Sequence, residues 1–153
     1  MDLTLFAVFF AACAAAASTG AMFQPGDWYE QLKRPSWTPP NWLFPIAWTI
    51  LYVAIAYAAS RIAGAETVTV REVGFALGLW AVQIACNTLW SPTFFGLRKL
   101  GAAMIVILCL WTAVAATMIV FWTIDPVAGW IFVPYLIWCS YAGALNFWIW
   151  RAN

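Results

Sequence analysis

Five apolar segments, each long enough to cross a bilayer, dominate this chain. They are Leu3–Phe23, Trp42–Ser60, Val73–Phe95, Gly101–Ile124 and Pro126–Trp150. A helix needs about 20 apolar residues to span the hydrocarbon core, where its backbone must be hydrogen-bonded internally. Short charged joints separate the segments, so neighbouring helices run antiparallel and no room is left for a soluble domain. The sequence therefore predicts an all-α membrane protein, in which residues 1–153 form a single domain, a bundle of five transmembrane helices.

Composition narrows the possible functions. Hydrophobic residues make up 65% of the chain and charged residues 8%, and a net charge of +1 gives no basic surface for nucleic acid. The chain has no histidine, which is the commonest metal ligand and general base. The four cysteines lie inside apolar segments without Cys-x-x-Cys spacing, which indicates buried thiols rather than a disulfide or a zinc site. We expect no metal site and no required cofactor.

The flanking charges predict an orientation in the membrane. The first segment is rich in Ala like a secretory signal, but it has no basic leader and follows Asp2, so we interpret it as a retained helix. One side of the bundle carries Lys33, Arg34, Arg98, Lys99 and Arg151, and the other carries Arg61 and Arg71. This excess predicts that the N-terminus is outside and the C-terminus inside a bacterial inner membrane. An outer-membrane location is the alternative.

The stretch Trp28–Tyr52 joins the first two spans and contains four Trp, two Tyr and four Pro. Because proline fixes φ and drives the preceding residue towards extended geometry, the start of this stretch is too interrupted for a helix. It is also too aromatic for a flexible linker. We interpret residues 28–40 as a stiff lid over one end of the bundle and residues 42–52 as the start of the second helix. The residues assigned to the lid are Trp28, Tyr29, Leu32, Arg34, Pro35, Trp37, Pro39 and Pro40.

The third segment carries small residues on one face and polar residues on another. Small side chains at Gly74, Gly78, Ala81 and Ala85 allow close approach of a second helix, either in a homodimer or within the same bundle. Gln83, Asn87 and Trp90 share a different face.

Depth along the helices places the side chains of Trp48, Asn87 and Asn146 in the half of the bilayer covered by the lid. Polar groups inside spans are costly, so this convergence predicts a pocket beneath the lid. The alternative is that these amides only cross-link helices by hydrogen bonds. A Trp-rich lining suits flat, apolar ligands, and without a nucleophile–base pair the only chemistry we expect is redox or light-driven.

Four motifs in fixed order carry a family resemblance. They are Trp28-Tyr29-x-x-Leu32-x-Arg34-Pro35-x-Trp37-x-Pro39-Pro40, Phe44-x-x-x-Trp48-x-x-Leu51-Tyr52, Asn87-x-x-Trp90-x-x-x-Phe94-Phe95-Gly96, and Pro134-Tyr135-Leu136-x-Trp138 with Leu145-Asn146. Together they resemble the TspO/MBR family of tryptophan-rich sensory proteins and translocator proteins, also called the peripheral-type benzodiazepine receptor. The resemblance covers essentially the whole chain.

The resemblance implies a five-helix bundle, usually a homodimer, that binds tetrapyrroles such as protoporphyrin IX and haem, sterols, and synthetic benzodiazepine-site ligands. The chain departs from the family pattern at Arg34, where Lys is usual, and at Phe147, where the sterol-binding motif has Tyr. The change at Phe147 weakens the prediction of sterol binding. Carried over by motif, the ligand-binding residues are Thr19, Trp48, Gln83, Asn87, Trp90, Trp138 and Ala142.

Three functions follow as hypotheses. The first is a membrane tetrapyrrole-binding protein that acts as a sensor, regulator or carrier and holds haem without an axial histidine. The second is an enzyme that promotes light-dependent oxidative degradation of protoporphyrin IX, with Trp48 or Trp138 carrying the radical. The third is a passive transporter of porphyrins or sterols, since no charged residue lies within the spans to couple an ion gradient.

Overall fold

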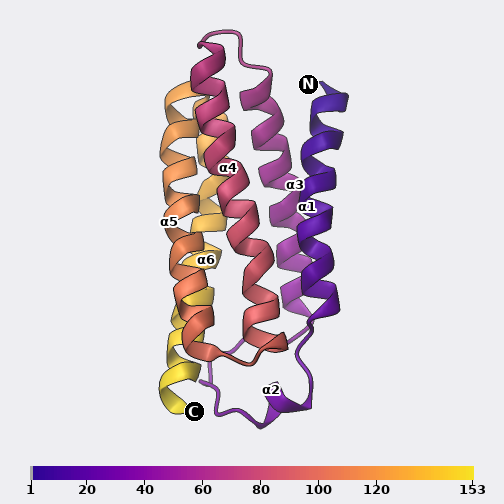
Figure 1. Ribbon diagram of the computed structural model, residues 1–153, viewed down its shortest axis with the longest axis vertical. Coiled ribbons are helices and arrows are strands. Elements are labelled where there is room, and N and C mark those ends of the chain that lie inside the picture. Colours follow the sequence, from indigo (N-terminus) through magenta and orange to yellow (C-terminus); the bar gives the residue numbers. More distant parts are fainter. Residues whose placement is uncertain (1) are drawn as a thin grey trace.

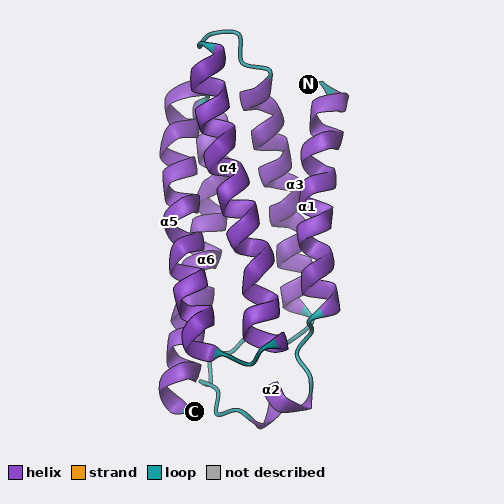
Figure 2. Ribbon diagram, viewed as in Figure 1, coloured by secondary structure: helices purple, strands orange, loops and turns teal. Residues whose placement is uncertain are grey.

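The computed structural model describes residues 2–153, and its five long helices run side by side along one axis (Figure 1). Among these helices, α1 packs on α3, α3 on α6, α6 on α5, α5 on α4, and α4 on α1. Among the described residues there is no strand (Figure 2). The predicted all-α bundle of five spans is confirmed. The helices are α1 (Leu3–Met22), α3 (Leu43–Ala63), α4 (Val70–Ser91), α5 (Leu100–Ile124) and α6 (Pro126–Ala152).

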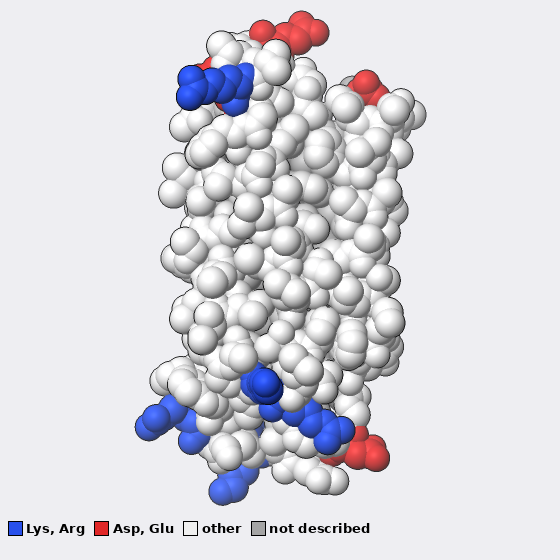
Figure 3. All heavy atoms as spheres, in the orientation of Figure 1, with Lys and Arg blue, Asp and Glu red and all other residues white. Residues whose placement is uncertain are grey.

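The charged side chains lie at the two ends of the bundle, with an uncharged band between them on the face shown in Figure 3. The C-terminus and the α1–α3 loop lie at one end, and the N-terminus lies at the other (Figure 1). All five helices are long and apolar enough to cross a membrane. The protein is therefore an integral, multi-pass membrane protein.

Local capping explains where the helices depart from the expected boundaries. α4 begins at Val70, three residues before the predicted start, because Thr69 and Glu72 form a reciprocal capping box. At its other end α4 continues into a π-helical turn, η1 (Pro92–Gly96), in which the Leu97 amide donates to the Pro92 carbonyl at 2.8 Å. Proline has no N–H to continue the α-helical pattern, so the wider turn follows directly.

The expectation that the first loop has no helix at its start is wrong. Asp27–Gln31 forms one short helix, α2, which projects beyond the end of the bundle (Figure 1). The first proline after this helix is Pro35, so nothing in residues 27–31 prevents a helical turn. The rest of the lid, from Leu32 onwards, is extended or turned as the proline content predicts.

The row of small residues on α4 faces away from the bundle. Gly74, Gly78, Ala81 and Ala85 are all exposed, and a methyl group built on either glycine would meet nothing within 4 Å. The alternative prediction, that these residues pack against another helix of the same bundle, is therefore wrong. The homodimer stays a prediction.

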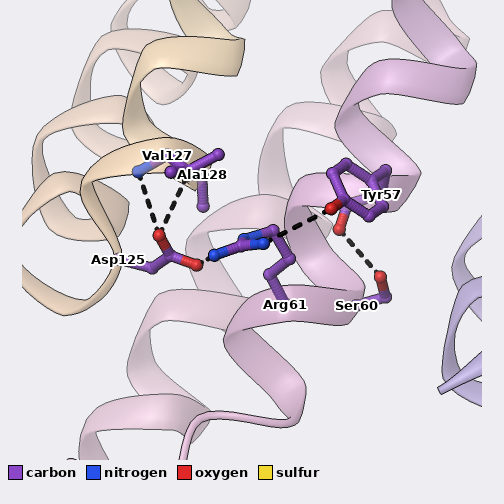
Figure 4. A network of polar contacts seen from close by, with 6 residues as sticks. All are labelled: Tyr57, Ser60, Arg61, Asp125, Val127 and Ala128. Carbon is purple, nitrogen blue, oxygen red and sulfur yellow. Dashed lines mark hydrogen bonds and ion pairs between the residues drawn. The ribbon is translucent and has the colours of Figure 1, made fainter. Parts of the chain in front are cut away.

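At the end far from the lid, one ion pair joins α3 to the α5–α6 turn. Arg61 on α3 donates to the Asp125 carboxylate and also contacts the Tyr57 hydroxyl, at 3.3 Å (Figure 4). The other oxygen of Asp125 accepts from the amides of Val127 and Ala128 at the start of α6. Burial raises the pKa of Asp125, but these hydrogen bonds outweigh it and hold the pKa below its usual value. Asp125 therefore fixes both a helix terminus and a helix–helix contact.

We expect Asp125→Asn to lower the midpoint of thermal unfolding in detergent by about 2–4 °C at pH 7, because it removes about 1 kcal/mol of ion pairing. The folded-state pKa is depressed, so this stabilisation is present above the ordinary Asp value of about 4 and is lost as the pH falls through the folded-state pKa. The difference between parent and variant should shrink accordingly at pH 3. Asp2→Asn is the matched control, because Asp2 caps α1 without an ion pair. Equal effects of the two substitutions at both pH values would contradict this role.

Candidate functional site

A cavity of about 420 Å³ lies between α1, α3 and α4 at the lid end of the bundle. We call it the inner cavity. Its walls come from three helices and from the segments where the first loop leaves α1 and enters α3. The lining residues are Ala16, Ala17, Thr19, Gly20, Ala21, Phe23, Gln24, Pro25, Asn41, Phe44, Pro45, Trp48, Thr49, Tyr52, Asn87, Trp90, Ser91 and Phe95.

The cavity exists because its walls are unequal in side-chain size. α1 contributes Ala16, Ala17, Gly20 and Ala21, whose side chains are too short to fill the space facing α3 and α4. Protein interiors are otherwise packed to the density of organic crystals, so a row of Ala and Gly opposite aromatic rings leaves a void. The opposite walls carry the large side chains of Phe44, Trp48, Tyr52, Trp90 and Phe95. The result is a slot with one aromatic side and one smooth aliphatic side.

The deep end of the inner cavity is closed by a chain of buried hydrogen bonds. The Tyr52 hydroxyl donates to Oδ1 of Asn87 at 2.7 Å, and Nδ2 of Asn87 donates to the Tyr135 hydroxyl at 2.7 Å. That hydroxyl in turn donates to Oε1 of Gln83 at 2.9 Å. The three helices α3, α4 and α6 are thereby linked at one depth. Asn87 consequently has both ends of its amide bonded to protein, as the cross-linking alternative predicts.

A second cross-link lies nearer the lid. The indole N–H of Trp90 donates to Oδ1 of Asn146 at 3.3 Å, and Nδ2 of Asn146 donates to the Leu100 carbonyl at 3.0 Å. Trp90 therefore presents its ring, and not its N–H, to the inner cavity. The polar residues inside the spans mainly hold helices together, while the cavity wall opposite α1 is mainly aromatic.

The structure places four of the seven predicted ligand-binding residues on the wall of the inner cavity: Thr19, Trp48, Asn87 and Trp90. It does not bring the other three, Gln83, Trp138 and Ala142, to that wall. Gln83 is fully buried and Ala142 nearly so, while Trp138 is partly buried and packs against the core.

The ring of Trp48, which lines the cavity, packs against two aromatic rings of α6. Trp48 contacts the ring of Tyr135 at 6.0 Å and that of Trp138 at 6.4 Å between centroids. Of the two residues considered for radical chemistry, only Trp48 borders the inner cavity. Nε2 of Gln83 and Nε1 of Trp138 are buried and have no hydrogen-bond partner within residues 2–153. These two donors are exceptions, because buried polar groups are normally hydrogen-bonded.

Sequence reasoning missed most of the cavity wall. Pro45 lies three residues before Trp48, and Thr49 lies four residues after Pro45, spacings that could have identified the same face of α3. On α1, the spacing of Ala16, Ala17, Gly20 and Ala21 defines one smooth face in the same way. The sequence prediction relied on the aromatic side chains, although the small residues of α1 create the cavity.

The lid covers the end of the bundle and is held there by contacts along its length. Tyr29 is buried, with its ring 6.1 Å from Phe94 and 5.4 Å from Phe95. Trp28 also contacts Phe94 and lies under the Arg98 guanidinium, which is 5.5 Å from its ring centre. Burial raises the pKa of Tyr29, although the Arg34 guanidinium beside it acts in the opposite direction. Aromatic packing on η1 thus anchors the first half of the lid.

Two hydrogen-bonded contacts join the lid to α6. The Asn153 side chain accepts from the Lys33 amide at 3.0 Å and donates to the Lys33 carbonyl at 3.1 Å. The Tyr141 hydroxyl donates to the Trp37 carbonyl at 2.6 Å. None of the eight residues assigned to the lid lines the inner cavity. The loop instead contributes to that wall through Phe23, Gln24, Pro25 and Asn41, which flank the lid.

The buried network yields a test of its role in packing. Tyr135→Phe removes a hydroxyl that both accepts from Asn87 and donates to Gln83, and it leaves two buried groups unpaired. We expect a loss of about 1–2 kcal/mol, seen as a lower unfolding temperature in detergent. Tyr52→Phe is the matched control, because it frees only one acceptor, on the wall of the inner cavity. A larger effect of Tyr52→Phe than of Tyr135→Phe would contradict this assignment.

Comparison with known proteins agrees with this architecture. The model of the TspO/MBR family matches residues 6–151. The chain is 54% identical over 153 residues to protein CrtK of Rhodobacter capsulatus, covering all of this chain and 95% of that protein. It is 48% identical to a tryptophan-rich sensory protein of Cereibacter sphaeroides, covering all of this chain and 94% of that protein.

A more distant relative is the human translocator protein. It is 34% identical over 137 residues, which cover 88% of this chain and 81% of the human protein. The family match includes all five spans, the lid and the walls of the inner cavity. On these grounds the chain belongs to the TspO/MBR family.

Proposed function

We propose that the inner cavity binds a flat, largely apolar tetrapyrrole, protoporphyrin IX or haem, and that the protein acts as a sensor, regulator or carrier in tetrapyrrole metabolism and transport. The observation that carries this proposal is the unequal slot, with aromatic rings on one side and Ala and Gly on the other. Its volume of about 420 Å³ falls within the range of roughly 300–1,000 Å³ typical of small-molecule sites.

The walls favour a planar ligand for a physical reason. The rings of Trp48 and Trp90 can stack on one face of a macrocycle, while the smooth surface around Ala17 and Gly20 accepts the other face. The chain contains no histidine, and neither of its fully buried thiols, Cys13 and Cys139, lines the cavity. Haem would therefore be held through its macrocycle and its carboxylates. Synthetic benzodiazepine-site ligands, which are also aromatic, would compete for the same space, and sterols fit an aromatic wall less well.

The charge distribution supports a proposal for orientation. Basic side chains gather at the lid end of the bundle, where Lys33, Arg34, Arg98, Lys99 and Arg151 lie in loops or at helix ends (Figure 3). An excess of Lys and Arg favours the cytoplasmic side of a bacterial inner membrane. The lid and the inner cavity would then face the cytoplasmic half of the bilayer.

Filling the cavity from its smooth side tests the proposed site. Ala17→Phe places a ring in the slot, and we expect about tenfold weaker binding of protoporphyrin IX, since overpacking costs about 1–3 kcal/mol. The measurement is a titration of Trp fluorescence and of the porphyrin Soret band in a non-ionic detergent. Ala15→Phe is the control, because Ala15 is exposed and lies outside the cavity. Unchanged affinity in a folded Ala17→Phe protein would contradict the proposal.

We infer that the outward-facing small residues of α4 form a homodimer contact, because all four are exposed and no residue within 2–153 packs on either glycine. Gly78→Leu should then reduce the dimer fraction measured by light scattering in mild detergent. Ala144→Leu, at an exposed position on α6, should not. A dimer fraction equal to the parent's in Gly78→Leu would show that the chains associate elsewhere, or that they do not associate.

A further inference from the structure

A second hollow, of about 520 Å³, lies on the lid directly beside the inner cavity. We call it the loop hollow. The two volumes share one lining residue, Asn41, which stands where the lid returns to α3. The loop hollow and the inner cavity therefore meet at Asn41. The lining residues are Leu32, Arg34, Pro35, Thr38, Pro39, Pro40 and Asn41.

The loop hollow differs from the inner cavity in charge. Arg34 is its one charged lining residue, whereas the inner cavity has none. The ion pair between Arg61 and Asp125 is the only one found within residues 2–153, so no carboxylate of the described chain neutralises Arg34. The inner cavity, which has no charged lining residue, thus adjoins the loop hollow, which has one unpaired cation in Arg34.

Contacts on the lid fix the position of the Arg34 guanidinium. It lies over the ring of Tyr29, 4.9 Å from the ring centre, and Tyr29 is itself buried. A guanidinium already held by stacking loses less conformational entropy when it binds an anion than a free side chain does. It also keeps its planar set of N–H donors, which matches a carboxylate in two-point geometry.

The walls of the loop hollow are rigid as well. Pro35, Pro39 and Pro40 have fixed φ angles, and both the amide and the hydroxyl of Thr38 donate to the Pro35 carbonyl, at 3.0 and 2.8 Å. The Leu43 amide donates to the Pro40 carbonyl at 3.0 Å and holds the return to α3. The hollow is therefore formed before any ligand arrives.

We propose that the loop hollow is a carboxylate subsite, in which Arg34 binds an acidic side chain of a ligand whose flat body occupies the inner cavity. This inference rests on the proposed function, and it narrows the ligand class to amphipathic molecules with an aromatic or macrocyclic body and a short anionic arm. The propionates of a tetrapyrrole have this chemistry, and sterols lack it. The lid then contributes directly to ligand selection.

Neighbouring charges do not provide the same site. The side chain of Lys33 is exposed and lines neither volume, while its backbone is bonded to Asn153. Asp27 and Glu30 lie on α2 and also line neither volume. Lys33 is therefore a matched control, because it is an adjacent cation that shares the lid but not the hollow.

The test compares two ligands on three proteins. Protoporphyrin IX carries two free carboxylates, and its dimethyl ester has the same macrocycle without the charges. Soret-band titrations in non-ionic detergent would give the affinity of the parent, Arg34→Gln and Lys33→Gln proteins for each ligand. We expect Arg34→Gln to weaken binding of the diacid by about fivefold, as for a partly exposed ion pair, and to leave the ester unchanged. The loss should shrink in 1 M salt, where charges are screened beyond about 3 Å.

Each other outcome is informative. Equal weakening of acid and ester by Arg34→Gln would mean that Arg34 acts only through the packing of the lid on Tyr29, and it would overturn the subsite. An equal loss in Lys33→Gln would show general attraction to a basic surface and would overturn it too. Tight binding of both ligands with no effect of Arg34→Gln rejects the subsite and leaves the proposed function standing. Failure of the parent to bind either ligand rejects the proposed function itself.

Discussion

The absence of water from the hydrocarbon core is the constraint on which the rest of this structure depends. Every backbone polar group must be paired inside its own segment, so the chain crosses as helices, and only side chains can vary where helices meet. α1 brings Ala and Gly to its contact with α3 and α4, whereas those helices bring Trp, Tyr and Phe. The inner cavity follows from that difference in size, without any break in the helices around it.

The same constraint explains what the buried amides do. An Asn or Gln in a lipid-embedded bundle needs a partner, and the nearest partners are side chains on neighbouring helices. Asn87 therefore bonds to Tyr52 and Tyr135, and Asn146 bonds to Trp90 and the Leu100 carbonyl. These bonds set the depth at which the cavity ends and the orientation of the Trp90 ring. Their contribution to ligand binding is indirect, because they hold the aromatic wall in place.

Much of this could be predicted from the sequence, and the failures have physical causes. Hydropathy and helix length identified all five spans, and helical rise placed Trp48 and Asn87 at the right depth. Periodicity assigns a residue to a face of its own helix but does not say which neighbour covers that face. Gln83, Trp138 and Ala142 were carried over to the ligand site by motif, which has the same shortcoming, and none of the three lines the inner cavity. The wall of small residues escaped notice because a missing side chain leaves no motif.

The two ends and the two sides of the bundle are held with unequal strength. Far from the lid, Arg61 and Asp125 join α3 to the α5–α6 turn, and α3 contributes eight buried residues to the core. α1 contributes two, Cys13 and Ala16, and along the inner cavity it presents short side chains to α3 and α4. Widening the inner cavity on the α1 side therefore moves mainly Ala and Gly away from the aromatic wall. The α1 side, whose short side chains create the inner cavity, is thus also the side that a ligand larger than the empty cavity would displace.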